Sequence, residues 1–143
     1  MELRELAFAS GIHSRFRVDP DMPLRCFETL YETWIQRSTR REIADEVLVC
    51  GALERVEGMI TIRLDGATAH IGLIAVEAQA RGKGLGKGLI RAAESWVVER
   101  GASRMEVVTQ GANSEACALY ERCGYRIGAE EDVYHLWITP EVP

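Results

Sequence analysis

The middle of the chain constrains the fold more than any other part. Three β-rich runs follow one another with almost no spacer, at residues 46–53, 55–64 and 67–76. Such a succession predicts an antiparallel meander. Asp65-Gly66 between the second and third runs predicts a two-residue type I′ turn, which needs positive φ at both central positions. Apolar residues then recur at helical spacing over residues 84–100, so a helix follows the third strand.

The remaining periodic segments complete a layered domain. Their patterns predict helices over residues 24–35 and 113–123, a short strand over 105–109, and one or two strands over 125–139. Residues 2–9 suit either a short helix or a frayed strand. A length of 143 residues suits one domain spanning residues 1–143. The order predicts the α/β or α+β class, with a mixed, mostly antiparallel sheet flanked by helices in three layers.

Charge and cysteine usage argue against several classes of function. The net charge is -5, which does not provide the positive field that nucleic acids or anionic membranes attract. We find no apolar run long enough for a membrane span and no secretory leader, so we expect a cytoplasmic protein. Zinc-ligand spacing is absent and we expect no metal. We expect free, mostly buried thiols at Cys26, Cys50, Cys117 and Cys123.

The sequence RGKGLGK, from Arg81 to Lys87, separates the third strand from the following helix. Backbone N–H groups are unpaired at such a helix start, and the helix dipole favours anions there. The glycines permit close approach, and the basic side chains add positive charge. The loop therefore suits a diphosphate, although a flexible solvated turn would have the same composition.

Two familiar phosphate loops do not fit this sequence. A Walker A loop would need glycine where Arg81 stands and a hydroxyl residue where Gly88 stands. A dinucleotide fingerprint would need its third glycine at Lys87 or Leu89. Both the NTPase and the Rossmann interpretations therefore fail.

Two other spacings do match a known family. The pattern R/Q-x-x-G-x-G/A is met by Arg81, Gly84 and Gly86, and Asn113 is followed by the segment ALYERCGY at residues 118–125. Together they resemble the GNAT superfamily of N-acetyltransferases. The resemblance implies a GNAT-type three-layer fold and acetyl-CoA as the cofactor, with a small-molecule amine as the acetyl acceptor.

The resemblance also implies roles for individual residues. The cofactor would be held by Ile74, Ala75, Val76, Arg81, Gly82, Lys83, Gly84, Leu85, Gly86, Lys87, Asn113 and Arg122. Tyr120 matches the general acid, and a tyrosine keeps its proton at neutral pH. Structural alternatives stay open: Tyr120 as a packing aromatic, Asn113 as a helix cap, and Arg122 as an exposed charge. Glu77, His70 or an ordered water could serve as the base.

The amino-terminal third resembles the dTDP-fucosamine acetyltransferase group, which acetylates a nucleotide-linked 4-amino-4,6-dideoxy sugar. The likeness includes Ser14, Arg15 and Phe16, which would contact the acceptor; a loop that only orders the first helix is the alternative. Members of that group carry an additional amino-terminal region, and the usual first strand has no clear counterpart before Glu5 in the given sequence. We expect that a homodimer could replace this sheet edge. A protein N-terminus, a lysine or a small polyamine are alternative acceptors. A non-catalytic acyl-CoA-binding module is a further alternative.

Overall fold

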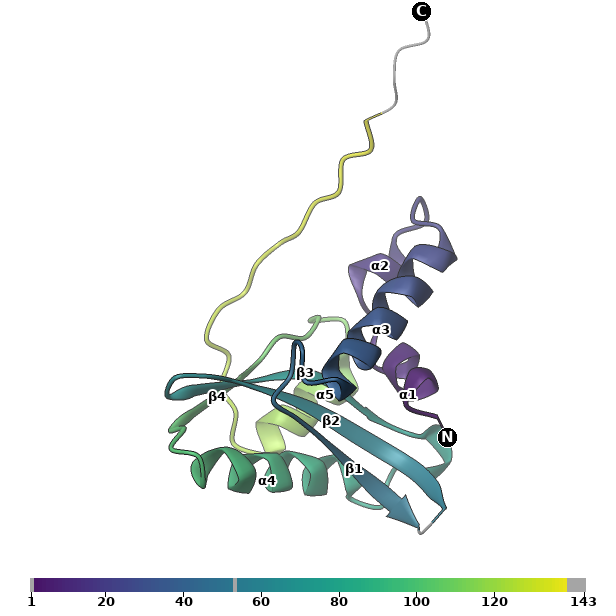
Figure 1. Cartoon of the computed structure of the whole chain (residues 1–143). Helices are drawn as coiled ribbons and strands as arrows, with labels where there is room; N and C mark the ends of the chain where they lie inside the picture. Colours follow the sequence, from purple (N-terminus) through teal and green to yellow (C-terminus); the bar gives the residue numbers. More distant parts are fainter. Residues whose placement is uncertain (1, 53, 139–143) are drawn as a thin grey trace, which may run out of the picture.

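The computed structural model describes residues 2–52 and 54–138 (Figure 1). Its elements in chain order are α1 (Leu3–Ser10), α2 (Arg15–Val18), α3 (Leu24–Thr39), β1 (Glu46–Ala52), β2 (Arg55–Asp65), β3 (Thr68–Val76), the short 3-10 helix η1 (Ala78–Ala80), α4 (Leu85–Val98), β4 (Arg104–Val107) and α5 (Ser114–Arg122). The strands form a sheet in the order β1-β2-β3-β4. The first three strands are antiparallel and β4 is parallel to β3. The predicted mixed sheet is confirmed, and of the two alternatives for residues 2–9 the structure has the helix, over Leu3–Ser10; Leu53 lies outside the described residues.

The hairpin between β2 and β3 lies one residue later than predicted. Asp65 pairs with Thr68, so the two turn residues are Gly66 and Ala67. Only Gly66 has positive φ, at 60°. A type I′ turn over Asp65-Gly66 is therefore wrong, and the first-position glycine is typical of a type II′ turn.

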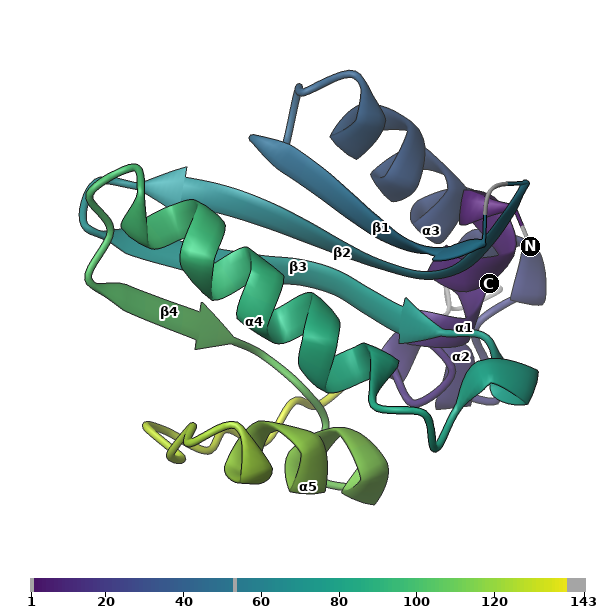
Figure 2. The same cartoon turned by 90° about the horizontal axis from the view of Figure 1, so that it is seen from below.

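Helices cover both faces of the sheet, as Figures 1 and 2 show. Met59 and Leu73 pack into one apolar cluster with α1 and α3. Ile60 and Ile62 of β2 pack into the other cluster with α4 and α5. This alternation follows from the two-residue period of a strand. It confirms the three-layer architecture.

A β-bulge interrupts the ladder between β2 and β3. Ile62 pairs with Ile71 and Ile60 with Ile74, so β3 contains one more residue than β2 over this stretch. The extra residue reverses the alternation of faces. Ile71 lies in the α4 cluster, whereas Leu73, two residues on, lies in the α1 and α3 cluster.

The segment after α5 differs from the prediction. Residues 125–138 run as an extended chain with no assigned strand, although one or two strands are expected from their composition; Thr139 lies outside the described residues. Val133, Tyr134 and Leu136 remain exposed. β propensity measures how well a side chain suits a pleated surface, but a strand also needs a partner ladder. This segment has strand-like composition without a ladder.

The cysteines are all free, as expected. Cys50, Cys117 and Cys123 are half-buried. Cys26, however, is exposed on α3, so the expectation of mostly buried thiols is wrong for this residue.

Gly11 provides a test of the packing between α1 and α3. A Cβ atom at this position would lie 2.3 Å from Cζ of Tyr31 and 2.8 Å from Cε2 of Phe27. We expect Gly11→Ala to lower the free energy of unfolding by about 1–3 kcal/mol, because both rings must shift. Urea denaturation measures the change. Gly128→Ala, where nothing lies within 4 Å, is the control, and equal stability losses in the two variants would contradict this packing.

Candidate functional site

The parallel pairing of β3 with β4 ends before β3 itself ends. The ladder runs from Thr68 opposite Arg104 to Ile71 opposite Val107. β3 continues to Val76, whereas the chain after β4 leads away toward α5 (Figure 2). The second half of β3 therefore has no ladder partner on the β4 side among the described residues.

The backbone of this half-strand directs donors into the space that β4 leaves. The N–H of Leu73 donates to Oγ1 of Thr61 (2.8 Å), and the N–H of Glu77 donates to a β2 carbonyl (2.7 Å). Because N–H directions alternate along a strand, the N–H groups of Ile74 and Val76 point to the opposite edge. These two amides can donate to an acceptor between β3 and the chain after β4.

The RGKGLGK loop follows this half-strand and opens α4. Gly82 and Gly84 adopt left-handed backbone, with φ of 76° and 79°. A Cβ at either glycine would meet nothing within 4 Å, so the space above the loop is open. Gly84 is the N-cap of α4 and provides no side-chain cap, which leaves the first helical amides for another acceptor. Lys83 and Lys87 are exposed beside them.

Arg81 and Gly86 connect the loop to its neighbours. Nε of Arg81 donates to the Val76 carbonyl (3.3 Å), and its guanidinium pairs with Glu115 of α5 (3.6 Å). A Cβ on Gly86 would lie 3.1 Å from Cδ2 of Leu119, so glycine permits the close approach of α4 to α5. The loop is thus held by the end of β3 and by α5.

The α5 candidates divide between structural and chemical roles. Oδ1 of Asn113 accepts the N–H of Ala116 (3.2 Å), so this side chain does cap α5. Tyr120 is 6% exposed, and its ring lies 5.8 Å from that of Tyr125. Burial raises the pKa of Tyr120 to about 12, so its hydroxyl stays protonated across the physiological range. Arg122, the last residue of α5, is exposed.

The predicted acceptor residues lie in the α1–α3 layer. Ser14 is the N-cap of α2 and is 3% exposed, and its hydroxyl has no hydrogen-bond partner among the described residues. The guanidinium of Arg15 lies 4.8 Å from the centre of the Phe16 ring. Phe16 lines a cleft of about 300 Å³ whose other walls are Met22 and residues 134–137.

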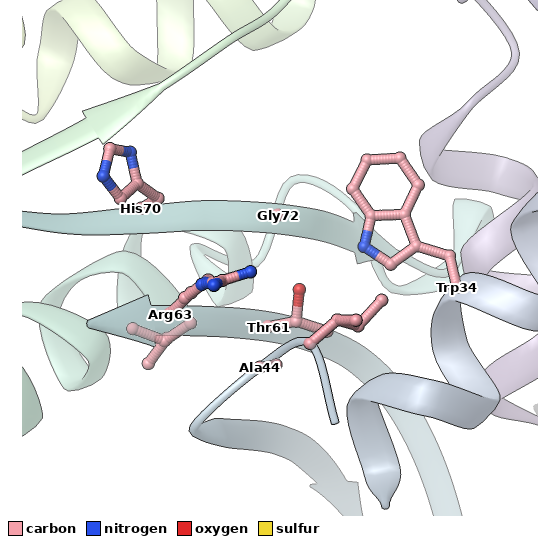
Figure 3. A pocket seen from close by; sticks show the side chains of 8 residues that line it. Trp34, Ala44, Thr61, Arg63, His70 and Gly72 are labelled. Atoms are coloured by element: carbon pink, nitrogen blue, oxygen red, sulfur yellow. The ribbon is translucent and has the colours of Figure 1, made fainter. Parts of the chain in front are cut away.

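A second cavity, of about 260 Å³, lies where α3 crosses the bulged stretch of the sheet (Figure 3). Its walls are Trp34, Ile43, Ala44, Thr61, Ile62, Arg63, His70 and Gly72. Gly72 helps to keep the cavity open, because a Cβ there would lie 2.7 Å from Oγ1 of Thr61. Nδ1 of His70 lies 3.7 Å from a carboxylate oxygen of Glu106.

The sequence indicates His70 as a candidate base, but it gives no sign of this cavity. Trp34 lies within the helix predicted over residues 24–35, and the sequence indicates no role for Gly72. No spacing along the chain connects residues 34, 61 and 72, which meet only through the fold. The bulge opposite Thr61 leaves no sequence signal beyond one glycine in a strand.

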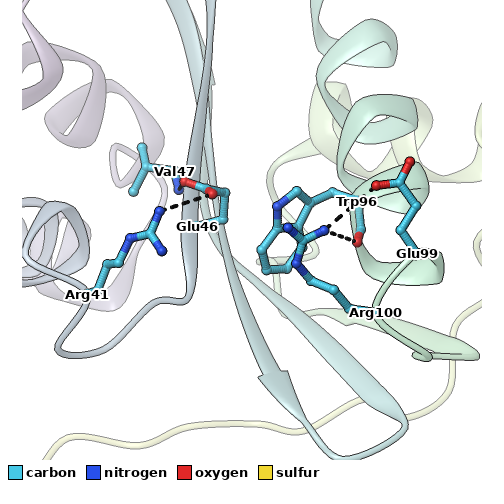
Figure 4. Close-up of polar contacts among 6 residues, drawn as sticks. All are labelled: Arg41, Glu46, Val47, Trp96, Glu99 and Arg100. Carbon is cyan, nitrogen blue, oxygen red and sulfur yellow. Dashed lines mark hydrogen bonds and ion pairs between the residues drawn. The ribbon is translucent and has the colours of Figure 1, made fainter.

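Some basic side chains are already engaged elsewhere (Figure 4). Arg41 pairs with Glu46 at 3.3 Å, before β1. Arg100 lies 3.9 Å from the Trp96 ring centre, donates to the Trp96 carbonyl (3.0 Å) and pairs with Glu99 (3.8 Å). These contacts belong to the start of β1 and the end of α4, away from the RGKGLGK loop.

The interrupted ladder leaves strand amides free, and the glycine-rich helix start offers free helix amides beside open space. Residues 10–125 match the acetyltransferase (GNAT) family, to which the chain therefore belongs. The residues present fit acetyl-CoA, the cofactor of this class. The RGKGLGK loop offers open space and free amides to the diphosphate of the cofactor, and the second half of β3 offers backbone amides to its extended arm.

Individual proteins show the same relationship. The chain is 31% identical to dTDP-fucosamine acetyltransferase from Escherichia coli O6:H1 over 140 residues, covering 94% of this chain and 57% of that protein. A solved Pyrococcus furiosus structure assigned as an acetyl transferase superposes with a TM-score of 0.71 at 26% identity, covering 94% and 93% of the two chains. A structure assigned as streptothricin acetyltransferase from Bacillus anthracis, in complex with acetyl coenzyme A, gives 0.56 at 31% identity, covering 58% and 49%.

The chain spans little more than half the length of the curated relative with the longest match, and less of the next ones. None of the helices in the described residues is long and apolar enough to cross a bilayer. Within residues 2–52 and 54–138 no group of three or more His, Cys, Asp or Glu could hold a metal ion.

The two ends of α4 allow a matched test of the anion site. Gly84 and Gly101 both have left-handed backbone, with φ of 79° and 84°, and open space beyond Cα. We expect Gly84→Asp to weaken coenzyme A binding at least 100-fold, because a carboxylate would face the diphosphate. Gly101→Asp carries the same backbone strain and charge at the other end of the helix, and should bind normally. Isothermal titration calorimetry would measure both, and equal affinities would contradict the site.

Proposed function

We propose that this domain transfers an acetyl group from acetyl-CoA to a primary amine. The observation that carries the proposal is the position of β3 between two features. Ile74 and Val76 direct amides to the space left by β4, while His70 and Gly72 of the same strand line the α3 cavity. An acetyl donor held beside β3 and an amine acceptor in the cavity would therefore lie a few residues apart along this strand.

The bound cofactor supplies a thioester whose carbonyl carbon accepts the amine. The RGKGLGK amides and lysines hold the diphosphate. The N–H of Val76 would donate to the carbonyl oxygen and stabilise the negative charge that develops there, while the N–H of Ile74 would pair with the extended arm of the cofactor. The chain's own contribution is therefore orientation and electrostatic stabilisation from the backbone of one half-strand.

Tyr120 is the proposed proton donor to the departing thiolate. It lies on α5, which Arg81 and Gly86 hold against the cofactor loop. Because burial raises its pKa to about 12, the hydroxyl is protonated whenever a thiolate leaves at physiological pH. The general acid is thus built into the same packing that shapes the loop.

His70 is the better of the two protein bases considered. Glu77 is almost fully buried, and its carboxylate is engaged by Arg55. His70 lines the cavity, and its Nδ1 lies 3.7 Å from a carboxylate oxygen of Glu106, which can orient the ring. His70 therefore acts as general base and Glu106 as its positioning residue.

The acceptor we favour is a nucleotide-linked 4-amino sugar. The relative named dTDP-fucosamine acetyltransferase is 31% identical, and the match covers 94% of this chain. The exposed guanidinium groups of Arg63 and Arg15 suit a diphosphate. A protein N-terminus, a lysine or a polyamine is the second candidate, because the net charge of -5 favours cationic acceptors. A cytoplasmic location and a single domain stay predictions.

Tyr120→Phe tests whether the domain is an enzyme. We expect kcat to fall roughly 100-fold or more, with unchanged coenzyme A affinity, because only the proton donor is lost. The assay is thiol release from acetyl-CoA with a panel containing an amino sugar nucleotide, a lysine peptide and a polyamine. Tyr125→Phe, which removes the hydroxyl of the adjacent ring, is the control. Cofactor binding without turnover on any amine would leave the non-catalytic module instead.

His70→Gln tests the proposed base. We expect kcat/KM to fall 10-fold to 100-fold near neutral pH, with the loss largest for strongly basic amines, which are mostly protonated there. The acidic limb of the pH profile should change with the variant. His13→Gln makes the same substitution outside the cavity and should leave the rate unchanged. An unchanged pH profile in His70→Gln would favour an ordered water as the base.

A further inference from the structure

The α3 cavity carries a positive charge that no carboxylate of its walls balances. Its eight lining residues include no aspartate or glutamate, but they include Arg63. The guanidinium of Arg63 makes no ion pair or hydrogen bond with another described residue. Arg37 and Arg41, at the end of α3, are by contrast paired with Glu42 (2.9 Å) and Glu46 (3.3 Å). The charge at this cavity is therefore opposite in sign to the net charge of -5.

Three hydrogen-bond donors from β2 and α3 converge on this cavity. Figure 3 shows the guanidinium of Arg63, the hydroxyl of Thr61 and the indole nitrogen of Trp34 pointing toward one another. Oγ1 of Thr61 accepts the N–H of Leu73 (2.8 Å), and the hydroxyl proton has no acceptor among the described residues. The indole N–H of Trp34 also donates to no described residue. An indole and a guanidinium can only donate, so the cavity offers donors that lack an acceptor.

Such a set of donors matches an oxyanion. A carboxylate or a phosphate presents acceptor oxygens, and its hydrogen bonds with a guanidinium are stronger than those between neutral groups. Thr61 is 1% exposed, so water competes little at its hydroxyl. An ammonium group would instead meet the like charge of Arg63 and could accept no hydrogen bond from any of the three donors. The Glu106 carboxylate beside His70, which could attract a cation, is already paired with Arg104 (2.9 Å).

The volume of the cavity limits the part of a ligand that it can hold. It measures about 260 Å³, whereas pockets that enclose drug-sized ligands measure roughly 300–1,000 Å³. Ile43, Ala44 and the ring of Trp34 provide apolar contact for a carbon skeleton. The cavity therefore suits a compound the size of an amino acid or one sugar ring, or one end of a larger molecule.

We propose that Arg63, Thr61 and Trp34 form an oxyanion subsite in the α3 cavity, and that the acetyl acceptor is a primary amine that also carries a carboxylate or a phosphate. This inference rests on the proposed acetyl transfer and assigns a charge to its substrate. Arg63 pairs with His70 across the β2–β3 ladder, so an anion bound to Arg63 keeps the rest of the ligand beside the proposed base. Arg63 is thus the specificity-determining residue. A nucleotide-linked amino sugar meets the requirement through its diphosphate, whereas a polyamine does not.

Isothermal titration calorimetry on the full chain, saturated with coenzyme A, tests the subsite without requiring turnover. Coenzyme A occupies the RGKGLGK loop, so an anionic probe cannot report on that loop instead. The probes 4-aminobutanoate, butylamine and 1,4-diaminobutane share an amine and a four-carbon chain and differ in the charge at the other end. Glucosamine 6-phosphate and glucosamine form the phosphate pair. We expect the anionic member of at least one set to bind 10-fold to 100-fold more tightly than its neutral partner.

The set that shows the preference identifies the group, a carboxylate or a phosphate. Equal or undetectable binding within both sets would overturn the proposal. So would tighter binding of 1,4-diaminobutane than of butylamine. Preference for the anion without acetyl transfer to any amine would support the subsite and contradict the proposed enzyme. Acetyl transfer to neutral and anionic amines at equal rates would support the enzyme and overturn the subsite.

Substitutions at exposed or half-buried positions assign the preference to individual donors. Arg63→Gln removes the charge and should bring the affinities of each anionic probe and its neutral partner within about 3-fold. Trp34→Phe keeps an aromatic ring but removes the N–H, and should weaken binding of the anionic probe alone by about 2-fold to 10-fold. Arg25→Gln makes the same change as Arg63→Gln at an exposed position near the start of α3, outside the cavity lining, and should keep the full preference. An undiminished preference in Arg63→Gln would overturn the proposal.

Discussion

The early end of the parallel ladder between β3 and β4 is the constraint on which the proposed site depends. If the ladder continued past Ile71 and Val107, β4 would satisfy the amides of Ile74 and Val76 and nothing else could bind there. A sheet normally pairs its backbone polar groups, so this interruption is costly unless a ligand or water replaces the missing strand. The fold thus leaves backbone donors, rather than side chains, for the proposed contacts with the cofactor.

Packing between α4 and α5 connects that space to the proposed acid. Gly86 lets Leu119 approach the first turn of α4, and Arg81 joins the Val76 carbonyl to Glu115. The helix that carries Tyr120 is therefore fixed by residues of the same loop that would hold the diphosphate. Burial of Tyr120 against Tyr125 and the sheet follows from this packing, and it is the main cause of the raised pKa of the Tyr120 hydroxyl. The proposed general acid is thus a hydroxyl that stays protonated until a thiolate accepts its proton.

The sequence predicted what depends on local pattern and missed what depends on tertiary pairing. Strand and helix order from residue 46 to residue 123 came from period changes, and the loop and Tyr120 came from spacing. The turn at Gly66 was displaced by one residue because Asp65 continues the ladder instead of entering the turn. Strands were wrong for residues 125–138 because composition reports strand preference but not the partner edge. The cavity beside Trp34 joins α3 to two strands, and no single segment encodes it.

One inserted residue in β3 lets a single strand serve both sides of the proposed reaction. Without the bulge opposite Thr61, Ile71 and Leu73 would face the same layer; with it, they face opposite layers. His70 and Gly72 can then line the cavity under α3, while the chain beyond Leu73 returns to regular pairing and aims the Ile74 and Val76 amides at the β4 side. The hydrogen bond from the Leu73 N–H to Oγ1 of Thr61 holds this change of direction in place. The hydroxyl of Thr61 thus replaces the backbone partner that the bulge removes, and the two proposed functions of β3 depend on this hydrogen bond.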